Sequence, residues 1–305
     1  MACLNDGQVA RTIQDLIGRF TPTPLSVDLP VMQRSVRLET NSPVILKLMR
    51  RVLEDRGEGV QGKEVSSSAV FFWRLVCDPD ASPESVSPQA SIVCADGLRY
   101  ASFGQSSFVA VDVAARQAVG FLAEQLTRDE AGFRETVLAA LFSMTADALS
   151  LTAFRAMVAR SGGKGILLVG MPSSDNQEFL NFAEESDFEL LSGGTTFLER
   201  TSDGLQVWGG FPPNRVVALG CCVFVETEFD GSPRLNRLPP AGLAERLRPY
   251  VLFDDEGNFC AQRDGVLGAL ARSPAYRFAY DGDSAEAAMV LDRLLKYLPA
   301  EGTMA

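Results

Sequence analysis

The stretch that decides the fold runs from residue 165 to residue 178 and reads GILLVGMPSSDNQE. Residues 165–169 form a short apolar run typical of a buried strand, and Gly170 marks a tight turn after it. A helix is expected over residues 176–185. This order of strand, turn and helix is the layout of a phosphate-binding loop and predicts an α/β fold. The candidate nucleotide- or ligand-binding residues of the loop are Gly170, Ser173, Ser174, Asp175, Asn176 and Gln177.

A working phosphate loop reads G-x-x-x-x-G-K-[ST], and each fixed position has a chemical task. The glycines let backbone N–H groups face the phosphates, the lysine neutralises the β/γ charge, and the hydroxyl holds Mg²⁺. Here Gly170 fills the first position, but Asp175, Asn176 and Gln177 stand at the glycine, lysine and hydroxyl positions. Three of the four functions are therefore absent from the loop.

The acidic residues of the loop predict how it behaves without a nucleotide. Asp175 stands where a helix N-cap belongs, and Glu178 completes a D-x-x-E pattern analogous to a capping box. These carboxylates can accept from the N–H groups that would otherwise bind phosphate, and such a cap contributes about 0.5–2 kcal/mol. A triphosphate would be repelled by both carboxylates and would find no lysine. The sequence therefore predicts loss of ordinary ATP binding.

Several segments on either side of the loop follow one another in the order found in a known family. They are SFVAVD at 107–112, AVGFLA at 118–123, a helix from Asp129, LLSGGTTFL at 190–198 and SPAYR at 273–277. Together with the loop they resemble the bacterial HPr kinase/phosphorylase-like family over about residues 35–298. The resemblance implies a variable N-terminal domain before a P-loop domain, a protein-serine or small-molecule kinase ancestry, and often an oligomeric assembly.

Two further features of active members of that family are absent from this chain. Active relatives follow the phosphate loop with an acidic pair that serves catalysis and Mg²⁺, in a pattern like L-L-x-D-D-x-x-F-L. Residues 190–198 place Gly193 and Gly194 where those aspartates would stand. Many relatives also carry a histidine in the strand before the loop, and residues 151–159 contain none. The resemblance therefore transfers no catalytic role to any residue here.

The composition excludes several classes of function. The chain has 305 residues and no histidine, so it cannot by itself build a Ser-His-Asp triad, a Cys-His dyad or a His-ligated metal site. Its formal net charge of −11 argues against a nucleic-acid or anionic-membrane partner. No stretch approaches the roughly 18 apolar residues of a membrane helix, and no secretory signal opens the chain. These features predict a cytoplasmic protein.

Cysteines and clustered charges add no predicted metal or cofactor site. The six cysteines show no metal-binding spacing, and Cys221 and Cys222 lie in the apolar run 216–225, where a strand interior is expected. The acidic clusters at 254–256 and 281–283 are interpreted as solvated turns. The basic pairs Arg50-Arg51 and Arg246/Arg248 are interpreted as solvated helix faces.

The predicted organisation is a mixed α/β N-terminal domain, residues 1–127, followed by a P-loop domain like that of HPr kinases, residues 128–305. In the first domain Ser42 and Pro43 predict the start of a helix that ends near residue 55. A further helix is expected at 7–20, joined by a proline-rich connector to a strand at 35–39. More strands are expected at 69–76, 90–94, 98–103, 107–111 and 117–121, the last four as an antiparallel meander.

The second domain is expected to begin with an amphipathic helix that starts at Asp129. A glycine-rich turn at 161–163 leads into the strand at 165–169. A helix near 241–249 and a final helix that reaches residue 298 complete this domain. The other predicted strands are 151–159, 188–191, 195–200, 205–209, 216–226 and 276–280.

Three functions are compatible with these observations. The favoured one is a non-catalytic pseudokinase that binds or regulates a partner protein or peptide. The alternative is an ATP-dependent serine or small-molecule kinase with a non-standard phosphate loop, in which Ser173, Ser174, Asn176 and backbone amides bind the nucleotide. A third is a structural subunit of a homo- or hetero-oligomer whose loop packs against an active paralogue.

Overall fold

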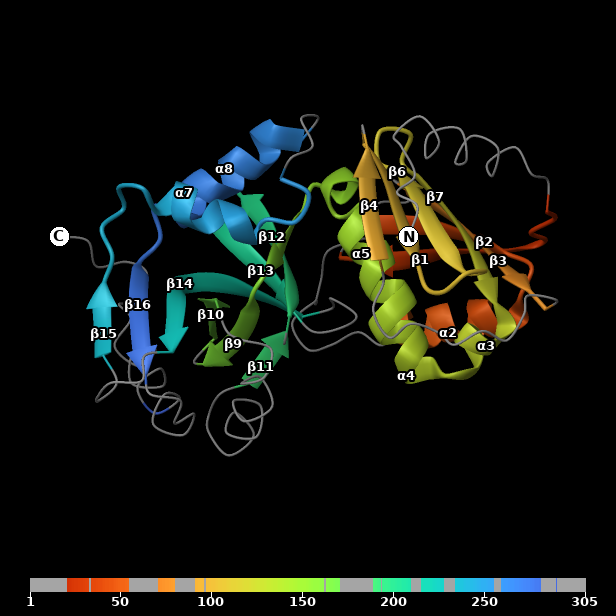
Figure 1. The fold of residues 1–305 in the computed structure, drawn as a ribbon, viewed down its shortest axis with the longest axis horizontal. Helices are drawn as coiled ribbons and strands as arrows, with labels where there is room; N and C mark the ends of the chain where they lie inside the picture. The colour runs from red at the N-terminus through yellow and green to blue at the C-terminus, as the bar shows by residue number, and fades with distance from the viewer. Residues whose placement is uncertain are drawn as a thin grey trace. The chain divides into compact units, whose positions relative to one another are not determined.

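Strands and helices both contribute to the structure, a computed structural model, and the predicted α/β class is confirmed. By their contacts the residues form two compact units (Figure 1). Unit 1 is Met1–Leu151 with Asp255–Cys260, and unit 2 is Thr152–Asp254 with Ala261–Ala305. The structure describes residues 21–32, 34–54, 71–79, 91–95, 97–161, 163–170, 189–192, 194–209, 215–227, 234–254, 259–280 and 289.

In its described part, unit 1 is built on a seven-stranded sheet in the order β1-β2-β3-β7-β6-β5-β4. Strands β4 to β7 pair antiparallel in sequence order, which confirms the predicted meander. Strand β3 runs parallel to both β2 and β7, so the sheet is mixed. The strands are β1 Leu25–Val31, β2 Arg34–Thr40, β3 Phe71–Asp78, β4 Ser91–Ala95, β5 Leu98–Ser102, β6 Phe108–Asp112 and β7 Gln117–Ala123.

Strand β1 lies where a proline-rich connector was expected. It pairs antiparallel with β2 and forms one edge of the sheet, with Pro30 opposite Ser35. Proline cannot donate a hydrogen bond to a neighbouring strand, but an edge strand has one side where no donor is needed. Pro30 therefore lies within an edge strand and does not interrupt it.

Helix α2, Pro43–Glu54, begins as the sequence predicts. The Ser42 Oγ accepts a hydrogen bond from the Ile45 N–H at 3.3 Å, which satisfies one of the free donors of the first turn. The buried side chains of Ile45 and Met49 lie one turn apart on the same face. The helix packs against β1 and β2.

A helical segment that follows β7 belongs to unit 1. It comprises α3 Glu124–Arg128, α4 Glu130–Gly132, a π-helical stretch Phe133–Leu138, α5 Ala139–Thr145 and a 3₁₀ turn Asp147–Leu149. In α5, Phe142 meets the buried Trp73 of β3 edge-to-face at 5.4 Å. The side chain of Arg99, on β5, donates to the Met144 carbonyl at 2.6 Å and to Asp147 at 2.5 Å. The compact units therefore divide after Leu151, later than the boundary expected between residues 127 and 128.

Unit 2 has a nine-stranded sheet in its described part. Seven strands follow the order β11-β9-β10-β14-β13-β12-β8, while β16 pairs with β14 and β15 pairs with β16. The single strand expected at 151–159 is two strands that break at Ala156, and β15 was not predicted. The strands are β8 Thr152–Arg155, β9 Met157–Ser161, β10 Lys164–Val169, β11 Glu189–Ser192, β12 Thr195–Thr201, β13 Gly204–Gly209, β14 Arg215–Thr227, β15 Arg234–Arg237 and β16 Ala275–Tyr280.

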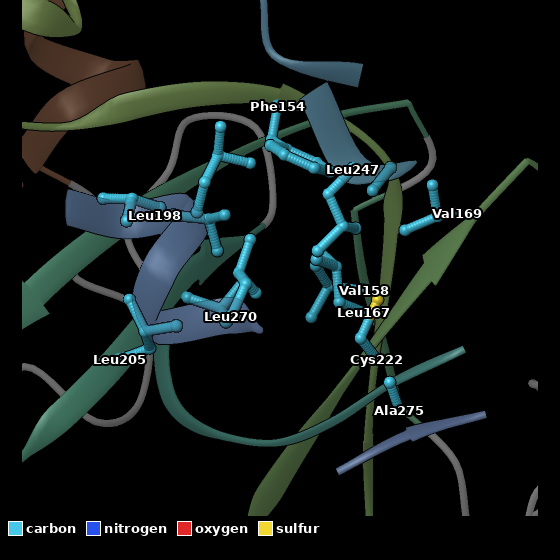
Figure 2. Close-up of a cluster of buried hydrophobic side chains, with 14 of the residues drawn as sticks. Phe154, Val158, Leu167, Val169, Leu198, Leu205, Cys222, Leu247, Leu270 and Ala275 are labelled. Carbon is cyan, nitrogen blue, oxygen red and sulfur yellow. The ribbon is translucent and has the colours of Figure 1, made fainter. Parts of the chain in front are cut away.

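Two helices cover one face of this sheet, α7 Leu243–Leu247, continued by a 3₁₀ turn Arg248–Tyr250, and α8 Cys260–Leu270. Figure 2 shows the apolar cluster between them and the sheet, which includes Leu247 and Leu270 from the helices and Leu167 and Cys222 from the strands. All four side chains are fully buried. Apolar contact therefore holds the helices on the sheet.

The adjacent cysteines of β14 lie in the strand interior, as predicted. Cys221 and Cys222 are both fully buried and neither forms a disulfide. Burial raises the pKa of Cys221 to about 12, and it raises the pKa of Cys222 as well. Both sulfurs are therefore inert thiols at neutral pH.

The helices predicted at 7–20 and 176–185 lie outside the described residues, as does the final helix apart from Met289. None of the helices described is long and apolar enough to span a membrane.

Candidate functional site

The candidate site is the edge of the second sheet where its parallel strands end. Strand β10 runs parallel to β14, and β14 runs parallel to β16, so the carboxyl ends of all three strands face the same way. The arrows of β14 and β16 point in the same direction in Figure 1. Open α/β sheets bind their ligands outside the carboxyl ends of such strands. We call this region the carboxyl edge and define it by Gly170, Phe224–Glu226 and Arg277.

Gly170 follows β10 and holds a conformation that only glycine adopts without strain. Its φ angle is +88°, and a Cβ built on it would lie 2.9 Å from the carbonyl oxygen of Val225 and 3.5 Å from the Tyr250 hydroxyl. The backbone of β14 thus leaves no room for a side chain. The one position of the phosphate-loop pattern that this chain keeps is therefore explained by close packing against β14, whether or not a phosphate binds.

Of the six predicted loop residues, the structure describes Gly170. The other five, at 173–177, lie outside the described residues, and so does Glu178. The capping interaction predicted between the loop carboxylates and the helix N–H groups therefore stays a prediction.

A carboxylate and two arginines that sequence reasoning did not join meet at the carboxyl edge. Arg277, on β16, donates from Nε to Glu226 Oε2 at 2.6 Å, and Arg246 of α7 donates to Glu226 Oε1 at 3.5 Å. The Arg246 guanidinium also lies over the Phe224 ring, 5.3 Å from its centroid. Arg246 therefore contacts this edge from α7, and with its side chain 48% exposed it also lies on the helix surface, as predicted. The sequence offered one signal for Glu226, because this acidic residue directly follows the apolar run 216–225.

The charge balance at this edge favours an anion over a cation. Two guanidinium groups surround one carboxylate, and the three side chains are 35–48% exposed. A metal ion at Glu226 would have to displace charge-assisted hydrogen bonds from a guanidinium. Among the residues described, no group of three or more His, Cys, Asp or Glu could hold a metal ion.

The turn between β11 and β12 contains Gly194, one of the two glycines that the sequence comparison set against an expected acidic pair. Ser192 Oγ donates to the Thr195 carbonyl at 2.6 Å and closes the turn. A Cβ added to Gly194 would meet nothing within 4 Å, in contrast to Gly170. Sterically, an aspartate would fit at Gly194. Steric crowding therefore does not explain the glycine at this position.

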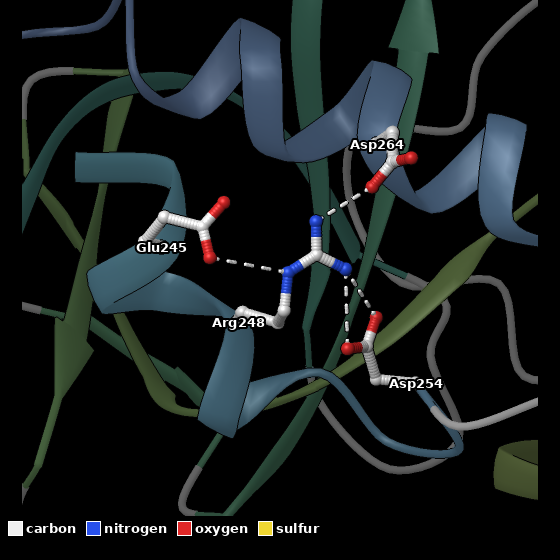
Figure 3. Close-up of polar contacts among 4 residues, drawn as sticks. All are labelled: Glu245, Arg248, Asp254 and Asp264. Atoms are coloured by element: carbon white, nitrogen blue, oxygen red, sulfur yellow. Dashed lines mark hydrogen bonds and ion pairs between the residues drawn. The ribbon is translucent and has the colours of Figure 1, made fainter. Parts of the chain in front are cut away.

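Arg248, the second arginine of its predicted pair, has a structural task (Figure 3). Its guanidinium donates to Asp254 at 3.1 Å and to Asp264 at 2.8 Å, and it forms an ion pair with Glu245 at 3.7 Å. Asp264 and Asp254 raise the pKa of Arg248, chiefly through the hydrogen bond that Arg248 donates to Asp264. Arg248 thus links the end of α7 to the following turn and to α8.

No protein-family model matches the sequence, and a search of curated proteins gives no match either. The fold is that of an α/β protein with a mixed sheet in each unit. Its second sheet carries a glycine turn beside an arginine-flanked carboxylate.

Proposed function

We propose that the chain is a non-catalytic relative of the HPr kinase/phosphorylase-like family, a pseudokinase that binds or regulates a partner protein or peptide. The proposal joins the resemblance in segment order to the loss of the loop lysine and hydroxyl at Asn176 and Gln177. It also includes the cytoplasmic setting expected from the sequence. The described cysteines carry free thiols, in agreement with such a setting.

One observation carries the proposal. The carboxylate that β14 brings to the carboxyl edge, Glu226, is engaged by Arg277 and Arg246. Phosphoryl transfer needs acidic groups that hold Mg²⁺ against the phosphates. A carboxylate bound to two guanidinium groups serves that task poorly, because the metal must compete with both cations.

One feature of the same edge favours the alternative, a kinase with a non-standard loop. Arg246 and Arg277 supply positive charge in a region where the sequence lacks the loop lysine. Guanidinium groups bind phosphate oxygens well. The two functions therefore differ in whether the arginine pair takes up the phosphates of a nucleotide.

Titration of the purified chain with Mg-ATP, followed by calorimetry, separates the two functions. We expect no measurable binding at millimolar nucleotide, and no phosphoryl transfer to serine peptides. Micromolar affinity that falls in the double variant Arg246→Gln/Arg277→Gln would overturn the predicted loss of ATP binding, and Mg²⁺-dependent ATP turnover in addition would establish the kinase alternative. Arg248→Gln serves as the matched control, since it removes a nearby arginine whose partners lie away from Glu226.

A further inference from the structure

A hollow of about 140 Å³ lies on one face of the first sheet, across strands β2, β3 and β7. The structure describes every residue that lines it, and the lining includes Glu39, Phe72, Arg74, Gln117 and Val119. Glu39 and Val119 lie opposite Arg74 on its two neighbouring strands, and Gln117 lies opposite Phe72. Because alternate residues of a strand share a face, these five side chains lie on the same side of the sheet.

The ion pair in this hollow leaves two polar atoms unused. Arg74 donates from Nε and Nη2 to the same oxygen, Glu39 Oε2, at 3.1 and 2.7 Å. On the same face, Arg37 instead engages both oxygens of Asp28, at 2.8 and 3.0 Å. Within the described part of the chain, Arg74 Nη1 and Glu39 Oε1 have no hydrogen-bond partner. The Arg74–Glu39 pair therefore offers one donor and one acceptor to a ligand.

Phe72 adds an exposed apolar surface beside this pair. Its side chain is 44% exposed, and aromatic rings pack well in offset stacks. The volume is close to that of an engineered cavity of about 150 Å³ that holds benzene, so one six-membered ring fits. The charges of Arg74 and Glu39 oppose each other, so the hollow favours a neutral ligand over an ion.

We propose that this hollow binds a small neutral ligand that consists of one planar ring and a carboxamide group. The ring lies against Phe72 and Val119, the amide carbonyl accepts from Arg74 Nη1, and the amide N–H donates to Glu39 Oε1. The lining residues all belong to unit 1. This site is therefore independent of the carboxyl edge and of the proposed function.

Benzamide is the probe, and saturation-transfer NMR over about 0.5 to 50 mM ligand measures its binding to the full chain. For so small a molecule we expect a dissociation constant of about 1 to 10 mM. N,N-dimethylbenzamide lacks the N–H donor and should bind about fivefold more weakly or worse. Benzoate should be weaker too, because Glu39 repels its charge. Equal binding of benzamide and either analogue would overturn the proposed contacts.

Three variants test the location of the site. Phe72→Ala and Arg74→Gln should each weaken benzamide binding about fivefold or more. Arg37→Gln is the matched control, since it breaks an ion pair on the same face outside the hollow, and it should leave the binding unchanged. Phe72 and Arg74 are both partly exposed, so the variants should fold, which circular dichroism checks. A wild type that does not bind benzamide, or an equal loss in Arg37→Gln, would overturn the site.

Discussion

Two arginines, one in each unit, hold a helix by ion pairs in opposite surroundings. In unit 1 the side chain of Arg99 is 0% exposed, and that of its partner Asp147 is 3% exposed. In unit 2 the side chain of Arg248 is 36% exposed and meets three carboxylates, Glu245, Asp254 and Asp264 (Figure 3). Counted by contacts, the second cluster is the larger one.

The difference in burial predicts that the Arg99–Asp147 pair matters more for stability than the larger Arg248 cluster. Water screens an exposed pair and solvates both partners when the pair breaks, so each such pair contributes little. A buried charge that loses its partner has no water to replace it, so breaking the pair is costly even where forming it added little. The number of ion pairs around an arginine is therefore a poor measure of its contribution to stability.

Each unit contains one of the two tryptophans of the chain, which allows the comparison to be measured unit by unit. Trp73 lies in β3 of unit 1 and Trp208 in β13 of unit 2, and both are buried. Trp208 also donates from Nε1 to Glu199 at 2.9 Å. Two units need not unfold in a single transition. Single-tryptophan backgrounds, Trp208→Phe and Trp73→Phe, therefore report the unfolding of unit 1 and unit 2 respectively.

The largest effect is expected from Asp147→Ala in unit 1. The variant leaves the buried Arg99 guanidinium without the Asp147 carboxylate, which should lower the free energy of unfolding by about 3–5 kcal/mol. Urea denaturation followed by Trp73 fluorescence measures the loss. Unit 2, followed by Trp208, should keep its midpoint.

A double variant separates the cost of a stranded charge from the value of the pair. Arg99→Met/Asp147→Leu removes both charges and keeps apolar volume, so it should recover much of the loss seen with Asp147→Ala. A double variant as unstable as the single one would mean that the pair itself stabilises unit 1. The two clusters, around Arg99 and around Arg248, would then affect the free energy of unfolding differently for a reason other than desolvation.

The sequence predicted those elements whose signal is local. Helix α2 was found from Ser42 and Pro43, and β14 from its apolar run, because capping and hydrophobic patterning act within a few residues. Helix α8 was missed, since Gly265 and Gly268 lower its helix propensity. In the folded chain a Cβ at Gly265 would lie 3.3 Å from Arg200 Nη1, the end of an exposed side chain that can move aside.

At the candidate site, the sequence predicted one backbone feature but none of the charge pairs. A strand followed by a glycine turn located Gly170 at the end of β10. The Glu226–Arg277 pair joins residues 51 positions apart, and the Arg99–Asp147 pair joins residues 48 apart. Such pairings depend on strand order and register, which no local pattern encodes. The sequence therefore indicated the strand and the glycine turn, but not which charges meet beside them.

An intermediate effect is expected at Gly170, where backbone packing and not charge sets the cost. Gly170→Ala combines strain at a φ of +88° with a Cβ placed 2.9 Å from the Val225 carbonyl oxygen, and should destabilise unit 2 by about 2–3 kcal/mol. Gly163→Ala is the matched control, because its φ is +81° and a Cβ there meets nothing within 4 Å. It should cost only the strain, about 1–2 kcal/mol.

Urea denaturation followed by Trp208 measures both glycine variants. Equal losses would show that β14 moves to admit the extra methyl group, and the packing explanation for Gly170 would then fail. The glycine would have to be explained by the loop that follows it.

The smallest effect is expected from Arg248→Gln, although it removes an arginine with three carboxylate partners. The variant should lower the free energy of unfolding of unit 2 by about 0.2–1 kcal/mol at low salt, because the network is open to water. The difference from the wild type should shrink in about 1 M NaCl, where charges are screened within about 3 Å.

The neighbouring Leu247→Ala should cost about 2–5 kcal/mol at either salt concentration, since Leu247 is fully buried in the apolar cluster. A salt-independent loss at Arg248 as large as that at Leu247 would show that its three ion pairs contribute as a buried pair does. Burial would then not explain a difference between the Arg248 cluster and the Arg99–Asp147 pair.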